Sequence, residues 1–431
     1  MGDQSSPRRS GVAVFFCVFL PFALGHYLSS LVRNVNAVLA PNLVGELALT
    51  PGQLGLLTSA FFFAAACVQL PVGMALDRYG PRKVQLVLMT CGALGAMLFA
   101  CGHSFGQLLL ARTLIGVGLG GCFMSAVKAV STWVDPKRLP SVQGYLIAVG
   151  GLGAASSTMP VTKLLQFMDW RGLFIAIAGL IACCGLLIRL LSPSTAAGTG
   201  KAPTVKSILD VYRNPAFRKA TSLVVVSHMV FFGIQGLWIG RWLSDVARFP
   251  EPVVAYLLYM GMASVIFGAI AVGMITEWAG RRGIAPLDVA AIGVALFVAI
   301  QMAIVFNWKP SMQLLSVMFT LVGTITGIEF AIVSQSMPKE LTGRAATCLN
   351  LVIFVGAFLV QAGFGQLIGL WQPDGGNHYP PIAYRVAFGV LVLLQLPGLV
   401  GYFLRRRPLQ CEIAILSPKE DYEIGTLRSP R

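Results

Sequence analysis

Twelve apolar stretches, most of them about 20 residues or longer, follow one another along the chain with short polar connections between them. An apolar helix of that length crosses the hydrocarbon core of a bilayer. With 56% hydrophobic and only 11% charged residues, an ordinary soluble protein is excluded. The pattern predicts an all-α membrane protein. The expected spans lie near 11–43, 53–76, 84–102, 107–134, 141–167, 172–191, 217–245, 252–276, 286–307, 311–336, 345–371 and 382–404.

The start of the chain is similar to a signal peptide, because Arg8 and Arg9 precede an apolar run. The run is too long for a signal peptide, however, and no small-residue cleavage site closes it. It therefore predicts a retained first span that continues past Arg33 to about Leu43, where Pro41 is the next helix breaker.

The polar segments divide the chain into four parts. The spans predict a six-helix bundle over residues 1–191 and a second over 217–404. Between them, 192–216 contains Pro, Gly and basic residues and reads as a cytoplasmic linker that holds at most a short surface helix. Residues 405–431 are expected to form a flexible cytoplasmic tail.

The net charge of +15 raises the question of nucleic acid, but the basic residues fall in short clusters between apolar runs. Such clusters are typical of topology signals and lipid headgroup contacts. Most of the 32 Lys and Arg lie on one side if both termini are cytoplasmic. We therefore expect a multi-pass protein of the inner membrane with both termini inside and no nucleic-acid partner.

A charged cluster after the second span occurs twice. Two glycines and an acid repeat about 200 residues later, although the basic pair does not keep that register and Trp278 replaces Arg78. The first copy consists of Gly73, Asp77, Arg78, Gly80 and Arg82, and the second of Gly273, Glu277 and Gly280.

Two further echoes at almost the same spacing indicate a duplication. Pro136 and its neighbours recur at Pro338, and His26 in the first span recurs as His228 in the seventh. Two halves of six helices with the same orientation imply a pseudo-two-fold axis along the membrane normal.

The six-plus-six arrangement, the basic central loop and the duplicated Gly73, Asp77, Arg78 and Gly80 pattern resemble the major facilitator superfamily over nearly the whole chain. The resemblance implies two pseudo-symmetric helix bundles, alternating access, a substrate site near the bilayer midplane, and a cytoplasmic latch at this cluster. Pro81 departs from the family pattern by displacing the basic pair one residue. The alternative is that these charges only fix topology.

Basic residues inside spans are candidate substrate ligands, because charge is costly in hydrocarbon and tends to line cavities. Arg33 and Arg241 each lie in the first span of their half, and Lys128 lies in the fourth. A guanidinium binds carboxylate or phosphate bidentately. The alternatives are that these side chains reach the membrane interface, or that Asp245 neutralises Arg241.

Glu329 in the tenth span is a candidate proton carrier, because a carboxyl in a low-dielectric site favours its protonated form. The alternative is a fixed partner for a base on a facing helix. Arg112, followed by Gly116, resembles a family motif that is associated with proton coupling.

His26 and His228 occupy equivalent positions on helices that are expected to line the cavity, and Arg33 and Gln235 lie seven residues on, on about the same face of each helix. Histidine binds substrate or relays protons near neutral pH. The alternative is that both histidines are hydrogen-bonded packing residues.

The sequence offers no enzyme motif. It contains no phosphate-binding loop, and its nine cysteines include no CxxC pair, so we expect no cofactor and no metal. The leading hypothesis is a monomeric, proton-coupled symporter of a small organic anion. The alternatives are an exporter of drugs or a siderophore-like metabolite, disfavoured by the missing Gly-Pro pair in the fifth span, and a non-transporting receptor or scaffold.

Overall fold

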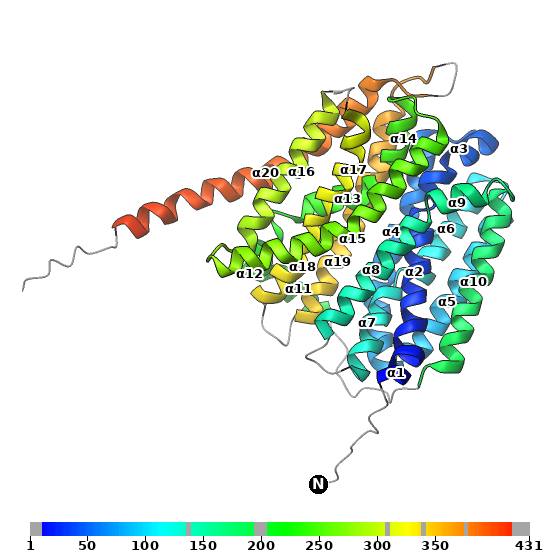
Figure 1. Cartoon of the computed structure of the whole chain (residues 1–431), viewed down its shortest axis with the longest axis horizontal. Helices are drawn as coiled ribbons and strands as arrows, with labels where there is room; N and C mark the ends of the chain where they lie inside the picture. The colour runs from blue at the N-terminus through cyan, green and yellow to red at the C-terminus, as the bar shows by residue number, and fades with distance from the viewer. Residues whose placement is uncertain are drawn as a thin grey trace, which may run out of the picture.

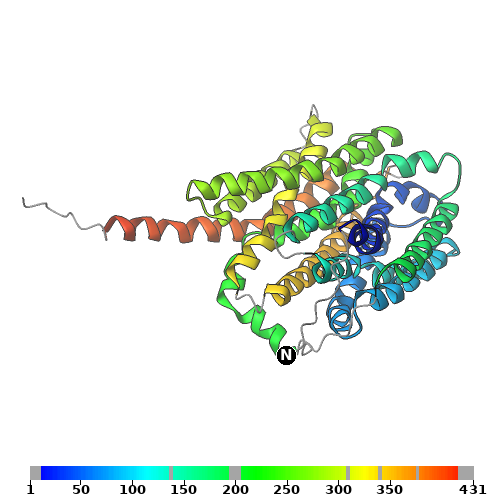
Figure 2. The ribbon, with the colours of Figure 1, turned by 60° about the horizontal axis from the view of Figure 1, so that its bottom comes forward.

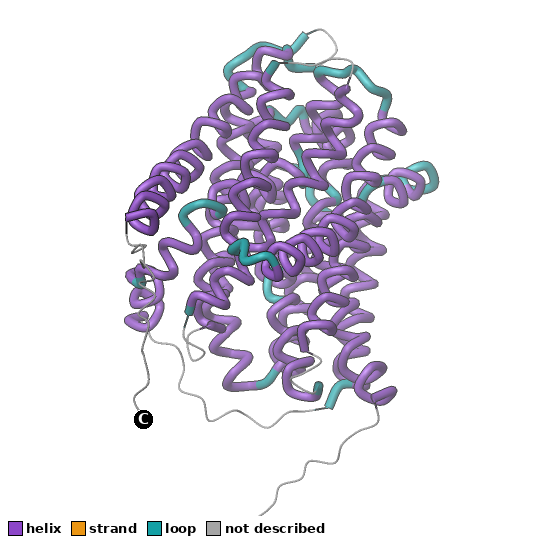
Figure 3. The backbone as a smooth tube through the Cα atoms, turned by 60° about the vertical axis from the view of Figure 1, so that its left-hand side comes forward, coloured by secondary structure: helices purple, strands orange, loops and turns teal. Residues whose placement is uncertain are grey.

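A computed structural model describes residues 11–134, 139–193, 205–306, 311–337, 342–374 and 378–415. These residues form helices joined by short loops and contain no strand (Figure 3). Among them, ten helices are long and apolar enough to cross a membrane, and the bent pair α12 and α13 makes an eleventh. Helix α8 covers part of the expected fifth span. The predicted all-α membrane fold is confirmed.

Five of the membrane-length helices lie in the first half, and several of the expected spans are broken into consecutive helices. Their bounds are α1 Gly11–Val14, the π-helical turn η1 Phe15–Phe19, α2 Leu20–Asn34, α3 Asn36–Leu47, α4 Pro51–Tyr79, α5 Pro81–Ala100, α6 Phe105–Leu119, α7 Cys122–Trp133, α8 Leu139–Ser156, α9 Met159–Leu164 and α10 Trp170–Leu191. The prediction that Pro41 ends the first span near Leu43 was wrong, because Pro41 lies inside α3 and the left-handed residue Ala48 ends it.

One short helix, α11 Val205–Arg213, precedes the second half, which begins with α12 Pro215–Thr221. The remaining helices are α13 Val225–Gln235, α14 Trp238–Asp245, α15 Glu251–Arg281, α16 Pro286–Val305, α17 Met312–Gly323, the 3-10 turn η4 Thr324–Gly327, α18 Ile328–Ser336, α19 Thr342–Ile368 and α20 Pro381–Ile415. Helix α20 continues to Ile415 and projects from the bundle (Figures 1 and 2), so the predicted flexible tail begins as helix. Residues 416–431, part of the linker (194–204), and the echoed positions Pro136 and Pro338 lie outside the described residues.

The contacts within the two halves follow the same plan. In the first half α2 packs on α8, α4 on α6, and α5 on both α6 and α10. In the second half α13 packs on α19, α15 on α17, and α16 on both α17 and α20. Each pair in the second half is the counterpart of a pair six spans earlier. The fold therefore has the pseudo-symmetry that the repeated sequence predicts.

The two halves meet through α4 against α19 and α8 against α15, pairs that the pseudo-two-fold axis exchanges. We call the end of the bundle that carries α3, α14 and the start of α4 the Asp245 end, which is uppermost in Figure 1. The opposite end, where α4 meets α5, is the Asp77 end.

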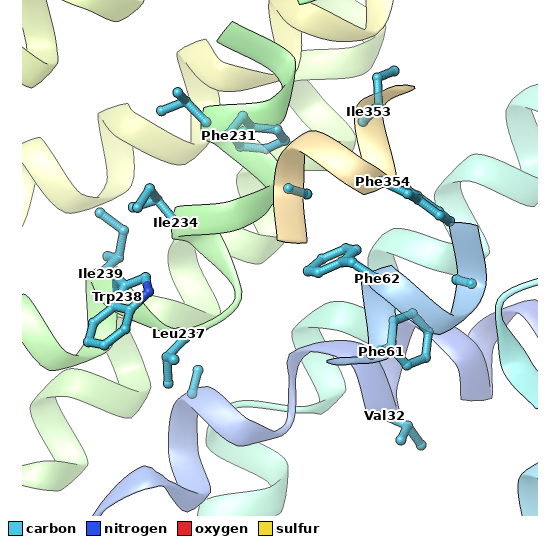
Figure 4. Packing of buried hydrophobic residues seen from close by; sticks show 14 of the residues in the cluster. Val32, Phe61, Phe62, Phe231, Ile234, Leu237, Trp238, Ile239, Ile353 and Phe354 are labelled. Carbon is cyan, nitrogen blue, oxygen red and sulfur yellow. The ribbon is translucent and has the colours of Figure 1, made fainter. Parts of the chain in front are cut away.

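Close backbone contact joins the halves toward the Asp245 end. A Cβ added at Gly55 would lie 2.8 Å from the Gln361 carbonyl oxygen, and one added at Gly365 would lie 2.4 Å from that of Pro51. Nearer the middle, the rings of Phe62 and Phe354 meet with centroids 5.8 Å apart (Figure 4). Glycine is needed at both positions because any side chain would push α4 and α19 apart.

Candidate functional site

Arg33 lies at the centre of the interface between the halves. It occupies the last turn of α2, one residue before the membrane-length helix ends at Asn34, and three turns of α3 follow after a break at Val35. Its guanidinium carbon lies 5.0 Å from the ring centroid of Phe232 on α13, in the opposite half. Among the described residues, no carboxylate pairs with Arg33. A half-buried cation is thus held between the two bundles by a cation–π contact alone.

Phe232 also contacts a buried histidine that lies beside a buried acid. The Nδ1 atom of His228 is 3.3 Å from Oε2 of Glu329, and both side chains are buried. The His228 ring packs 5.1 Å from Phe232, one helical turn along α13. The same short stretch of α13 therefore contacts Arg33 and, through His228, the acid of α18.

His26 does not repeat this arrangement. Its ring packs against Phe123 with centroids 4.9 Å apart, and a Cβ added at Gly150 would lie 2.4 Å from its Nε2 atom. Its Nδ1 atom is buried without a hydrogen-bond partner among the described residues. The two histidines are equivalent in sequence, but only His228 faces a carboxylate.

Two other predicted residues lie inside single halves. Gln235 accepts a hydrogen bond from the Thr320 hydroxyl at 2.7 Å and contacts the Met262 sulfur at 3.6 Å, both in the second half. Arg112 is fully buried, donates to the Arg33 carbonyl at 3.3 Å and lies 5.9 Å from the Phe61 ring. Arg112 therefore supports the backbone of Arg33 and offers a substrate no exposed surface.

Arg241 lies at the Asp245 end, away from Arg33. It pairs with Asp245 on its own helix at 3.2 Å, and the same buried carboxylate accepts from the Tyr384 hydroxyl at 2.6 Å and lies 3.1 Å from Nδ1 of His378. A small pocket beside this cluster is lined by both halves, including Val44 and Leu54 of the first. At this end of the bundle, Arg241 is therefore neutralised by Asp245 and lies beside residues of both halves.

Lys128 lies near the Asp77 end of α7. Its ammonium nitrogen is 2.7 Å from Oδ1 of Asp77, and both side chains are nearly half exposed. The structure therefore brings a predicted substrate ligand to the predicted gating motif. Both residues belong to the first half, so in this conformation Asp77 does not bridge the two bundles.

The gating motif is a helix junction of a single residue. Helix α4 ends at Tyr79 and α5 begins at Pro81, and Gly80 between them has a φ of 79°, which glycine adopts without strain. Pro81 fits the first position of a helix, which explains its departure from the family pattern. Gly73 lies in open space inside α4.

The basic residues of this motif contact the first half. Arg82 donates to the carbonyl of Arg189 near the end of α10, and Arg78 lies 5.2 Å from the ring of Tyr79. The motif therefore ties α4, α5, α7 and α10 together at the Asp77 end.

The second copy of the motif is looser. Glu277 pairs with Arg281 on its own helix at 2.7 Å, and both are exposed. Gly273 and Gly280 lie within α15 with open space around them, and the glycine with positive φ is Gly283, three residues later. The positive-φ glycine of the second copy therefore lies at a different position in the repeat from that of the first.

The Major Facilitator Superfamily model matches residues 22–361, more than half of the chain. The chain belongs to this superfamily. The structure is similar to that of a bacterial homolog of the human lysosomal transporter Spinster, solved in an inward-facing, unoccupied conformation. That structure aligns with a TM-score of 0.72 at 16% identity, over 93% of this chain and 98% of the other.

Two curated relatives of this superfamily chain are named as transporters. The probable sulfoacetate transporter SauU of Cupriavidus necator is 32% identical over 152 residues, which is 35% of each chain. The probable L-galactonate transporter of Escherichia coli is 29% identical over 303 residues, which is 66% of each chain. The match thus spans less than two thirds of either relative.

The sequence analysis did not identify several residues of the candidate site. Phe62, Phe232 and Phe354 form the aromatic layer around Arg33, with centroids 5.8 to 6.3 Å apart. Phe232 could have been found, because it lies one turn after His228 on the same helical face. No sequence pattern indicated that His378 and Tyr384 contact Asp245, since each lies more than 130 positions away from it in sequence.

The Asp77 contact generates a test of the gating motif. Asp77→Asn removes the charge that holds Lys128, so we expect slower exchange between the two conformations with little change in substrate affinity. Stability should change by less than about 1 kcal/mol, because the pair is exposed. The measurements are counterflow rate in proteoliposomes and ligand affinity in detergent. Glu277→Gln, whose partner is on its own helix, is the matched control and should be silent, and a loss of affinity without a change in rate would contradict a gating role.

Proposed function

We propose that the protein is a secondary active transporter that moves a small organic anion, a carboxylate or phosphate ester, across the inner membrane by alternating access with proton coupling, and that it acts as a monomer. The observation that carries the proposal is Arg33, a cation between the two halves with no carboxylate partner among the described residues.

The neighbouring embedded bases are accounted for in other ways. Asp245 neutralises Arg241, and Asp77 neutralises Lys128. Arg112 also lacks an acid but is fully buried. Of these four bases, Arg33 is the one that has no acidic partner among the described residues and is still partly exposed. Since an uncompensated charge is costly in a membrane, an incoming anion gains a strong electrostatic partner at this point.

The names of the relatives support the same chemistry. Sulfoacetate and L-galactonate both bear a carboxylate group, and the relatives named for them are similar to this chain over 35% and 66% of its length. A carboxylate docked on Arg33 would lie against the Phe232 face, with the aromatic layer around it.

The His228 and Glu329 pair supplies the proton-binding element of the proposal. The imidazole and carboxyl groups are 3.3 Å apart and buried, so removing or adding one proton changes the charge of a site that water does not screen. Phe232 contacts both the Arg33 guanidinium and the ring of His228. Proton binding at the pair therefore changes the electrostatic potential where the anion binds.

The contacts between the halves support an orientation and a state. The distribution of basic residues favours both termini inside, which makes the Asp245 end the outer face. The glycine contacts join the halves there, while the Asp77 pair stays within one half. In this reading the transporter is closed to the outside and receives or releases its substrate at the cytoplasmic face.

Removing the Arg33 charge tests the substrate assignment. Arg33→Gln should weaken anion uptake by at least roughly 100-fold, because it deletes a charge-assisted, bidentate hydrogen bond. The measurement is uptake of a labelled sugar acid into proteoliposomes, together with the thermal midpoint to confirm folding. Arg281→Gln, an exposed base at the end of α15, is the control. Uptake that survives Arg33→Gln would remove this residue from the substrate site.

Fixing the protonation state of Glu329 tests the coupling. In Glu329→Gln we expect substrate counterflow to persist while accumulation driven by an acidic outside is lost, because the amide cannot release a proton. Glu251→Gln, exposed at the start of α15, should leave both activities intact. Undiminished accumulation driven by the pH gradient in Glu329→Gln would show that the coupling proton binds elsewhere.

A further inference from the structure

One face of α15 carries exposed apolar side chains along the whole length of the helix. Tyr256, Met260, Phe267, Met274 and Trp278 lie on this face, since their spacings of four and seven residues correspond to one and two helical turns. From Tyr256 to Trp278 the face is about 33 Å long, which matches the hydrocarbon core of a bilayer at about 30 Å. This face of the protein therefore meets lipid.

The neighbouring helices pack against other faces of α15. A Cβ added at Gly151 of α8 would lie 3.0 Å from Ile266, and one added at Gly268 would lie 2.4 Å from the hydroxyl oxygen of Thr324, which follows α17. Ile266 and Gly268 flank Phe267 in sequence, so they point about 100° to either side of it. Phe267, which is 70% exposed, is thus directed away from both contacts.

At the Asp77 end, this apolar face finishes at an arginine stacked on a tryptophan. The guanidinium carbon of Arg282 lies 4.0 Å from the ring centroid of Trp278, and both side chains are exposed. Among the described residues, no carboxylate pairs with Arg282, whereas its neighbour Arg281 pairs with Glu277 at 2.7 Å. The stacked arginine is therefore an unneutralised base at the edge of a lipid-facing surface.

The backbone after α15 holds Arg282 in this position. The amides of Arg282 and Ile284 both donate to the carbonyl of Ala279, at 2.9 and 3.0 Å. Gly283 between them has a φ of 76°, which glycine adopts without strain. The helix thus ends in a defined cap, and Arg282 is fixed about one turn beyond Trp278.

The groups along this face follow the order of the groups in a phospholipid. Apolar side chains come first, and Trp278 then supplies an indole, a ring that is typical of the level where acyl chains meet headgroups. Arg282 lies beyond it, at the depth of the lipid phosphate. A guanidinium stacked on an aromatic ring keeps the N–H groups along its edge available, and these bind phosphate bidentately.

We infer that the Trp278 and Arg282 end of α15 binds an anionic phospholipid, with the headgroup phosphate on Arg282 and an acyl chain along Met274 and Phe267. An anionic headgroup is favoured because a zwitterionic one places its own cation beside the unneutralised base. From Phe267 to Trp278 the face is about 17 Å long, close to half of the roughly 30 Å hydrocarbon core, as a chain within one leaflet requires.

Quenching of tryptophan fluorescence by brominated lipid tests the inference. The full-length protein is reconstituted in phosphatidylcholine with increasing mole fractions of either phosphatidylglycerol or phosphatidylcholine that carries brominated acyl chains. The Trp278 signal is the part of the emission that Trp278→Phe removes. We expect the brominated phosphatidylglycerol to quench this signal at a roughly 5-fold lower mole fraction, because one base attracts the anionic headgroup. Equal quenching by the two lipids would overturn the inference.

Two arginine variants assign this preference to a residue. Arg282→Gln should bring the two quenching curves to within about 2-fold of each other, because the amide offers the phosphate no charge. Arg218→Gln removes an exposed base of α12 at the same end of the bundle, and it should keep the preference. A preference that survives Arg282→Gln, or that Arg218→Gln removes equally, would assign the effect to overall surface charge and overturn the inference.

Thermal midpoints in detergent give a second readout that does not depend on Trp278→Phe. Added phosphatidylglycerol should raise the midpoint of the wild-type protein more than phosphatidylcholine does, because a ligand that binds only the folded state stabilises it. The difference should disappear in Arg282→Gln, and a difference that this variant leaves unchanged would contradict the inference. Neither measurement includes a transported anion, so a failure here leaves the proposed function at Arg33 unaffected.

Discussion

An unneutralised guanidinium between two apolar bundles is the constraint on which the rest of this molecule depends. Among the described residues, Arg33 contacts the Phe232 ring and pairs with no carboxylate, and its side chain is only partly exposed. Arg112 fixes the backbone that presents it, through a hydrogen bond to the Arg33 carbonyl. The fold thus keeps an unneutralised charge between the two bundles, and our proposal places the anionic substrate there.

The remaining polar groups of the interface form layers on either side of that charge. Toward the Asp245 end come the amides of Asn34 and Gln361, then the glycine contacts of α4 with α19, and finally the buried Asp245 cluster. Glycine permits each close approach, because the helices join through their backbones and not through large side chains. Helices that meet through glycines can move apart without rearranging large side chains. Such an interface fits our proposal that the two ends of the bundle open in turn.

The sequence predicted the fold in most of its particulars. Hydropathy placed the spans, and the echo of Gly73 at Gly273 exposed the two halves whose contacts follow one plan. The sequence could not show which charged side chains pair with one another in the folded protein. Lys128 and Arg33 look alike as embedded bases, yet one meets Asp77, 51 positions away in sequence, and the other meets no acid among the described residues. Likewise, His26 and His228 are equivalent by repeat, and only tertiary packing gives Glu329 to one of them.

The most direct test of the central claim couples the ligand charge to the Arg33 charge. Affinities of L-galactonate and its neutral amide are measured by calorimetry for the wild-type protein and for Arg33→Gln, which completes a thermodynamic cycle. We expect the wild-type protein to prefer the acid by roughly 100-fold or more and the variant to bind acid and amide about equally. An equal preference for the acid in both proteins would contradict the account, because the ligand charge would then be bound elsewhere.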